Sequence, residues 1–130
     1  MIYNEQIEAL FFNARHVGVL DCLEPLTICS RKQLSTNSTK TSELYLRCDE
    51  SGLITQARFK VTGNPYLIAS FEYLCRHVVH TAIQEPPTLD HIFLIKALSI
   101  PAIHYAPVLL VEAHYYHALE LLKKIFGEKS

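Results

Sequence analysis

The stretch GLITQARFKVTGNPYLIAS, residues 52–70, contains the change from strand to helix that decides the fold. Its first half alternates, which predicts a strand. The apolar face of that strand is expected to carry Leu53, Thr55, Ala57, Phe59 and Val61. From Asn64 the apolar residues recur about every 3.6 positions, which predicts a helix with Asn64 as its N-cap and Pro65 as its first residue. Such a corner exposes backbone N–H groups that can hold an anion, a metal or a catalytic side chain.

The residues before this stretch predict the rest of a sheet. Residues 43–48 alternate, with Leu44, Leu46 and Cys48 on one face and Glu43, Tyr45 and Arg47 on the other. This is typical of a half-buried strand, and the turn at 49–52 joins it to the next strand as an antiparallel hairpin. Residues 26–31 predict a first strand, and the Ser-, Thr- and Asn-rich residues 33–42 predict a loop.

Helices are predicted both before and after the strand residues in the sequence. Apolar spacing favours helices over residues 4–13, from 64 onward, over 89–98 and over 107–126. Pro101 is expected to begin a loop through Ala106, and Gly127 to end the last helix. The predicted fold is therefore α+β, with a small antiparallel sheet of about three strands covered by helices, in a single domain over residues 1–130.

The composition excludes several classes of protein. The 130 residues are 49% hydrophobic with a net charge of -1, so no basic excess favours nucleic-acid binding. The N-terminus lacks a signal peptide and no apolar run can span a bilayer, so a cytoplasmic protein without a membrane contact is expected. Neither a phosphate-binding loop nor a nucleophile elbow occurs, so an enzyme is not expected. His114 and His117 are interpreted as surface histidines.

Three stretches in fixed order resemble one known family. They are YNEQIEALFFNARHVGVLD (3–21), GLITQARFKVTGNPYLIAS (52–70) and IPAIHYAPVLLVEAHYYHAL (100–119). They are similar to the U-type iron–sulfur cluster assembly scaffolds, IscU and the N-terminal domain of NifU. The similarity covers nearly the whole chain, apart from a poorly matched segment at 22–41. It implies the scaffold-protein fold of that family.

The resemblance also implies where a cluster site would lie. The family holds a nascent cluster with three cysteines, helped by an acidic residue and a histidine. The cysteine positions fall on Ser38, Asn64 and Pro107, the acidic position on Lys40 and the histidine position on Ala106. Iron in such clusters needs thiolate ligands, so the usual ligand set is missing. A shift of two residues would instead place His104 and Tyr105 at the His–Cys pair.

These matches lead to a first hypothesis. The chain is a diverged scaffold that keeps the framework without the ligands. It would act as an adaptor or regulator in iron–sulfur cluster biogenesis, with a cysteine desulfurase or another assembly protein as partner and with no cofactor.

Two alternatives stay open. In the first, iron, zinc or a cluster binds through Cys22 and Cys29 together with His16 or His104, whereas Cys48 and Cys75 are expected to be core residues. In the second, the protein is a structural homo-oligomer. Tyrosines such as Tyr3, Tyr105 and the Tyr115–Tyr116 pair are candidate contacts with partners, since Tyr is enriched at interfaces.

Overall fold

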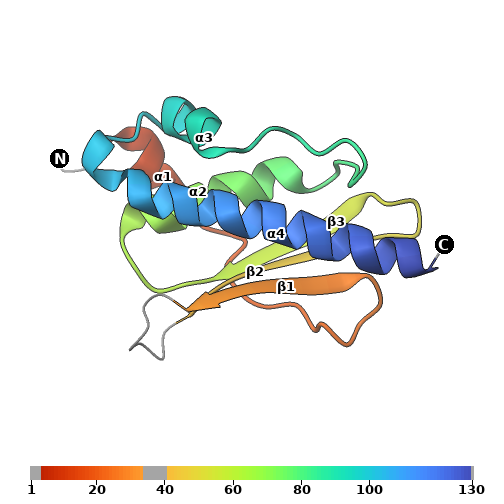
Figure 1. The fold of residues 1–130 in the computed structure, drawn as a ribbon. Coiled ribbons are helices and arrows are strands. Elements are labelled where there is room, and N and C mark those ends of the chain that lie inside the picture. Colours follow the sequence, from red (N-terminus) through yellow and green to blue (C-terminus); the bar gives the residue numbers. More distant parts are fainter. Residues whose placement is uncertain (1–3, 34–40, 130) are drawn as a thin grey trace.

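The computed structural model describes the backbone of residues 4–33 and 41–129. Its elements, in chain order, are α1 (Glu5–Phe12), β1 (Thr27–Gln33), β2 (Thr41–Cys48), β3 (Ile54–Lys60), α2 (Pro65–Val78), α3 (His91–Leu98), the 3-10 helix η1 (Ala102–His104) and α4 (Tyr105–Lys129) (Figure 1). The three strands form an antiparallel sheet in the order β1-β2-β3. The predicted α+β architecture is confirmed.

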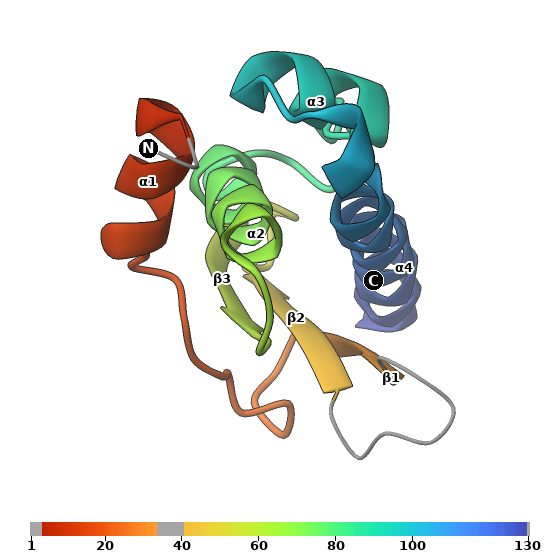
Figure 2. The same ribbon diagram turned by 90° about the vertical axis from the view of Figure 1, so that its left-hand side faces the viewer.

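The helices lie on one face of the sheet (Figure 2). α2 packs on β3, α4 packs on β1 and β2, α1 lies against α2, and α3 lies against α4. The Phe59 and Phe71 rings stack with centroids 5.3 Å apart and join β3 to α2. Other fully buried side chains of this core are Leu44, Leu46, Ile54, Leu74, Tyr115 and Leu122.

A bulge in the hairpin changes the predicted buried face of β3. Arg47 pairs with Gln56 but Cys48 pairs with Ile54, so Thr55 is an extra residue in the ladder. An extra residue reverses the side-chain alternation beyond it. Ile54 is therefore buried and Thr55 exposed. The predicted face is right at Ala57 and Phe59, and wrong at Thr55.

The second face of β2 is more buried than the alternation suggests. Glu43 and Tyr45 are 8% and 5% exposed although they point away from Leu44 and Leu46. Glu43 accepts hydrogen bonds from the Tyr45 hydroxyl and from Arg31 Nε on the neighbouring strand. Figure 2 shows the segment between α1 and β1 passing on this side of the sheet. The prediction of a half-buried strand is therefore wrong for β2.

The segment just after α1 covers the outer edge of β3. Val17 pairs with Phe59 in a parallel bridge. The Gly18 N–H donates to the Phe59 carbonyl at 2.9 Å, and the Phe59 N–H donates to the His16 carbonyl at 2.9 Å. The N–H and C=O groups of Phe59 on this edge strand are thus paired within the chain.

The last helix is longer than predicted at both ends. η1 and the first turn of α4 replace the expected loop at 102–106. Pro107 lies in that first turn, where a missing N–H breaks no helical hydrogen bond. Gly127 does not end the helix, since α4 continues to Lys129 and Gly127 is not among the residues with positive φ. A helical glycine costs only about 1 kcal/mol relative to alanine.

Candidate functional site

The corner before α2 is built as the sequence predicts. The Asn64 Oδ1 accepts a hydrogen bond from the Leu67 N–H at 2.9 Å, and Pro65 is the first helical residue. This side-chain cap satisfies one of the N–H groups that a helix start leaves free. The amide oxygen of Asn64 is therefore committed to the helix.

A stacked pair of rings joins this corner to the start of α4. Tyr66 and His104 stack with ring centroids 4.2 Å apart. Tyr66 follows Asn64 by two residues, and His104 precedes Ala106 by two. The corner and the start of α4 are therefore neighbours, so the family positions at Asn64, Ala106 and Pro107 share one end of the molecule (Figure 1). Ser38, Lys40 and Tyr3 lie outside the described residues.

The side chains at these shared positions do not fit a thiolate-ligated cluster. Asn64 offers only an amide oxygen, which already accepts the hydrogen bond that caps α2. The side chains of Ala106 and Pro107 have no atom that could bind a metal. With the shifted register, His104 lies against Tyr66 and Tyr105 offers a phenol that is 39% exposed. In the described ranges 4–33 and 41–129, no group of three or more His, Cys, Asp or Glu side chains could hold a metal ion.

In the described part of the chain, no three of the four residues of the alternative metal site form a group that could hold a metal ion. Cys22 is exposed, and Cys29 is half-buried on β1. Burial raises the pKa of both thiols, and the charge of Asp21 raises the pKa of Cys22 further. A thiol with a raised pKa is a weaker metal ligand because less of it is thiolate. Cys48 and Cys75 are buried, as predicted.

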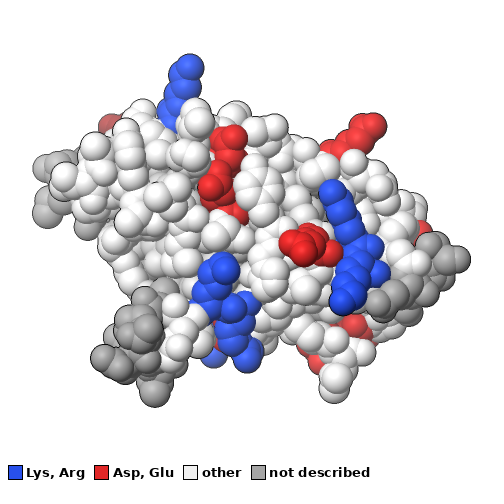
Figure 3. All heavy atoms as spheres, in the orientation of Figure 1, with Lys and Arg blue, Asp and Glu red and all other residues white. Residues whose placement is uncertain are grey.

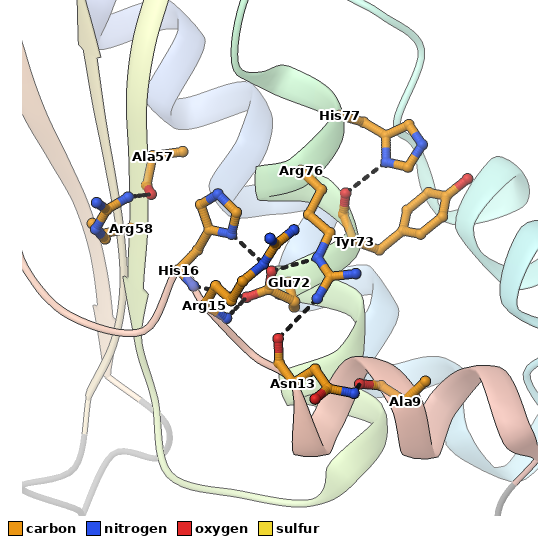
Figure 4. A network of polar contacts seen from close by, with 10 residues as sticks. All are labelled: Ala9, Asn13, Arg15, His16, Ala57, Arg58, Glu72, Tyr73, Arg76 and His77. Carbon is orange, nitrogen blue, oxygen red and sulfur yellow. Dashed lines mark hydrogen bonds and ion pairs between the residues drawn. The ribbon is translucent and has the colours of Figure 1, made fainter.

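A polar cluster surrounds Glu72 of α2, a residue that no sequence pattern marks as functional (Figure 4). The carboxylate is completely buried. Oε1 accepts hydrogen bonds from the backbone N–H groups of Arg15 and His16, both at 2.9 Å. Oε2 accepts from His16 Nδ1 and from Arg76 Nε, both at 2.7 Å. Arg76 also donates to the Asn13 carbonyl at 2.8 Å, so the cluster holds the end of α1 against α2.

These four donors fill the acceptor sites of a carboxylate. Burial raises the pKa of Glu72, but the bonds from His16 and Arg76 outweigh it and the net pKa is lowered. Glu72 is thus a fixed anion with no lone pair left for a metal. The Nδ1 atom of His16 is occupied by its hydrogen bond to Glu72, so only the Nε2 atom of this ring remains for a ligand.

A second polar cluster lies between α4 and the sheet. His114 is completely buried, and the prediction of a surface histidine is wrong for it. Its Nδ1 lies 2.9 Å from Ser30 Oγ, and its Nε2 lies 2.7 Å from Ser42 Oγ. His117 Nδ1 lies 2.8 Å from the same Ser30 oxygen. His114 follows Val111 by three residues on the apolar stripe of α4, and this spacing could have shown that it faces the sheet.

Several apolar side chains of α3, η1 and the first half of α4 are exposed. Their exposed fractions are 65% for Ile92, 85% for Ile103, 39% for Tyr105, 47% for Leu109 and 50% for Tyr116. Tyr115, by contrast, belongs to the core. On the face seen in Figure 3, uncharged surface separates small groups of basic and acidic side chains. Tyr105 and Tyr116 are therefore accessible to a partner.

Replacing Asn64 with alanine is expected to lower the free energy of unfolding by about 1 kcal/mol, because the cap of α2 is lost. Asn64→Asp is the matched control, since aspartate also caps a helix. Urea unfolding of the three proteins measures the effect. Equal losses in both variants would show that the cap contributes nothing.

Comparison with known proteins identifies the family. The family model described as NifU-like N terminal domain matches residues 2–120. Among solved structures, a nitrogen-fixing NifU-like protein (N-terminal) from Brucella abortus has a TM-score of 0.65 and 18% sequence identity, over 99% of this chain and 96% of that one. A search of curated proteins finds no match. No helix in the described part of the chain is long and apolar enough to cross a membrane. The resemblance seen in the sequence is confirmed, and the chain belongs to the family of NifU-like N-terminal domains.

Proposed function

We propose that this protein is an adaptor or regulator in iron–sulfur cluster biogenesis that does not assemble a cluster in the usual way. Its family is one of iron–sulfur scaffolds and not of enzymes. The observation that carries the proposal is the chemistry at the shared end of α2 and α4. Asn64 uses its side chain to cap a helix, and Ala106 and Pro107 have no side-chain donor. Ser38 and Lys40 complete the proposed set of lost ligand positions.

The same end of the molecule offers a surface for a protein partner. Ile103, Tyr105 and Leu109 are exposed next to the degenerate positions. Exposed aromatic and aliphatic side chains of this kind supply the buried centre of many interfaces. The proposed partner is a cysteine desulfurase or another protein of cluster assembly, and it would bind here without transferring sulfur to a ligand cysteine.

Anaerobic reconstitution tests the proposal. The protein is incubated with ferrous iron, cysteine and a cysteine desulfurase, and then desalted. Iron and acid-labile sulfide content and the visible absorption spectrum are recorded. We expect less than about 0.1 iron per chain, because a cluster needs thiolate ligands that these positions lack. Near-stoichiometric iron and sulfide in the unaltered protein would overturn the proposal.

The matched control restores the family's cysteines. The variant Ser38→Cys, Asn64→Cys, Pro107→Cys is treated in the same way and is expected to retain more iron and sulfide than the unaltered chain. If the unaltered chain instead retains metal, the double variant Cys22→Ser, Cys29→Ser tests the alternative site. Loss of that metal in the double variant would move the function to these two cysteines.

A partner experiment completes the test. The desulfurase is immobilised, and its binding to the unaltered chain is compared with binding to the variant Ile103→Ser, Leu109→Ser. Both residues are exposed, so the variant is expected to fold and to bind at least tenfold more weakly. Absence of binding by the unaltered chain would remove the adaptor role for that partner.

A further inference from the structure

The cluster of Ser30, Ser42, His114 and His117 has no role in the proposed function. Ser30, Ser42 and His114 are completely buried, and His117 is half-buried. They come from β1, β2 and α4, so their hydrogen bonds join the last helix to two strands of the sheet. The two members of each serine–histidine hydrogen bond lie 72 to 87 positions apart in the chain.

The hydroxyl proton of Ser30 links the protonation of the two histidine rings. The Ser30 oxygen lies within hydrogen-bond distance of two ring nitrogens, His114 Nδ1 and His117 Nδ1. A hydroxyl has one O–H to donate. For that O–H to be satisfied in the buried site, one of the two nitrogens must be without a proton. When both nitrogens carry protons, the Ser30 O–H loses its partner, and an unpaired buried polar group costs free energy.

The surroundings of His114 decide which histidine stays neutral. The charged or titratable groups that act on it are Lys32 on β1 and His117 on α4, and both oppose a positive charge. From α2 the neighbour is the Phe71 ring, with centroids 5.5 Å apart, and from β2 it is the Ser42 hydroxyl. Neither of these two can neutralise a charge. Burial is the main cause that lowers the pKa of His114, to about 4.

We propose that these four residues form an acid-sensitive lock between α4 and the strands β1 and β2, closed while one of the two Nδ1 atoms lacks a proton and opened when both carry one. The lock is a regulatory device in the fold. It holds the strands that flank residues 34–40 against the helix that begins at Tyr105. Acid therefore loosens α4 from the sheet near the end of the molecule where the family positions meet.

The direction of the pH dependence follows from the pKa of His114. Its pKa in the folded chain, about 4, lies below the value of 6.5 for an unperturbed histidine. The unfolded state thus binds more protons, so stability is full above about pH 6.5 and is lost as the pH falls toward 4. From pH 7.5 to pH 5.0, His114 alone is expected to raise the unfolding equilibrium constant roughly 25-fold.

Urea unfolding at pH 7.5 and pH 5.0 tests the lock. The change between the two pH values is measured in the unaltered protein, in His114→Gln and in the control His77→Gln, which alters an exposed histidine. Because each protein is compared with itself, a general loss of stability in His114→Gln does not affect the comparison. We expect the 25-fold component to disappear in His114→Gln and to persist in His77→Gln. An unchanged pH dependence in His114→Gln would overturn the lock.

A measurement on the unaltered chain decides the question even if His114→Gln does not fold. Nitrogen-15 NMR of the imidazole rings reports which ring nitrogens carry protons. We expect the His114 ring to be neutral at pH 5.0, with a proton on one of its two nitrogens. In the folded chain, we expect that the Nδ1 atoms of His114 and His117 do not both carry a proton. A positively charged His114 in folded protein at pH 6 would overturn the proposal.

Discussion

The variant Glu72→Leu should lose roughly 3–5 kcal/mol of unfolding free energy, the cost of removing one partner from a buried ion pair. The Glu72 carboxylate accepts four hydrogen bonds, from His16, Arg76 and the backbone of Arg15 and His16. Leucine fills a similar volume but accepts none of them. The guanidinium of Arg76 then loses its anion, and two backbone N–H groups lose their acceptor. Urea unfolding at pH 7 measures the loss.

The control for this variant is Glu120→Leu, the same substitution at an exposed position of α4. It should change the free energy of unfolding by no more than about 0.5 kcal/mol. A loss below about 1 kcal/mol in Glu72→Leu would contradict the conclusion that the Glu72 carboxylate accepts four stabilising hydrogen bonds.

Low pH should remove the contribution of Glu72 to the free energy of unfolding. The pKa of Glu72 is lowered from its ordinary value of 4.5, so its stabilising effect is present above about pH 4.5 and is lost as the pH falls through the folded value. The contribution of His114 is already changing at pH 6.5. The two polar clusters can therefore be separated by pH as well as by substitution.

The variant Phe71→Ala should destabilise the fold by roughly 3–5 kcal/mol, the range for removing a buried phenylalanine. Phe71 is completely buried on α2, where its ring stacks on Phe59 of β3. Its ring also lies beside His114, so the cavity adjoins the polar cluster below α4. The loss is measured by urea unfolding above pH 7, where His114 is neutral.

Phe12→Ala is the matched control, since Phe12 is 76% exposed. It should cost less than about 1 kcal/mol. Similar losses in the two phenylalanine variants would mean that the stacked Phe59–Phe71 pair is not at the centre of the core.

The parts of the fold that the sequence predicts are those with local signals. Residues 43–48 alternate, and Asn64-Pro65 has the chemistry of a helix start, so the hairpin and α2 follow from neighbours in the chain. The bulge at Thr55 depends on how two strands pair, and no residue type near it signals the extra position. The early start of α4 depends on η1, which packs against Tyr66 through His104.

The site shows the same division. Asn64, Ala106 and Pro107 are the positions that the resemblance assigns to the family's ligands, and the fold brings them to one end of the molecule. Glu72 and His114 are not predicted as buried polar residues because, apart from Arg76 beside Glu72, their partners lie 56 or more positions away along the chain. A single sequence shows a carboxylate or an imidazole on a helix, but not the distant donors that allow it to be buried.

The pairing of residues 16–18 with Phe59 has a consequence for contacts between copies of the chain. Exposed strand edges are templates for strand addition, which leads to swapped dimers and aggregates. Val17 and Gly18 lie against the β3 edge at Phe59, so an incoming strand cannot pair with the edge there. In the described part of the chain, β1 pairs with β2 alone. Strand pairing between copies of the chain is therefore expected at β1. Two copies joined through their β1 edges have no second β1 edge to offer, so this pairing ends at a dimer.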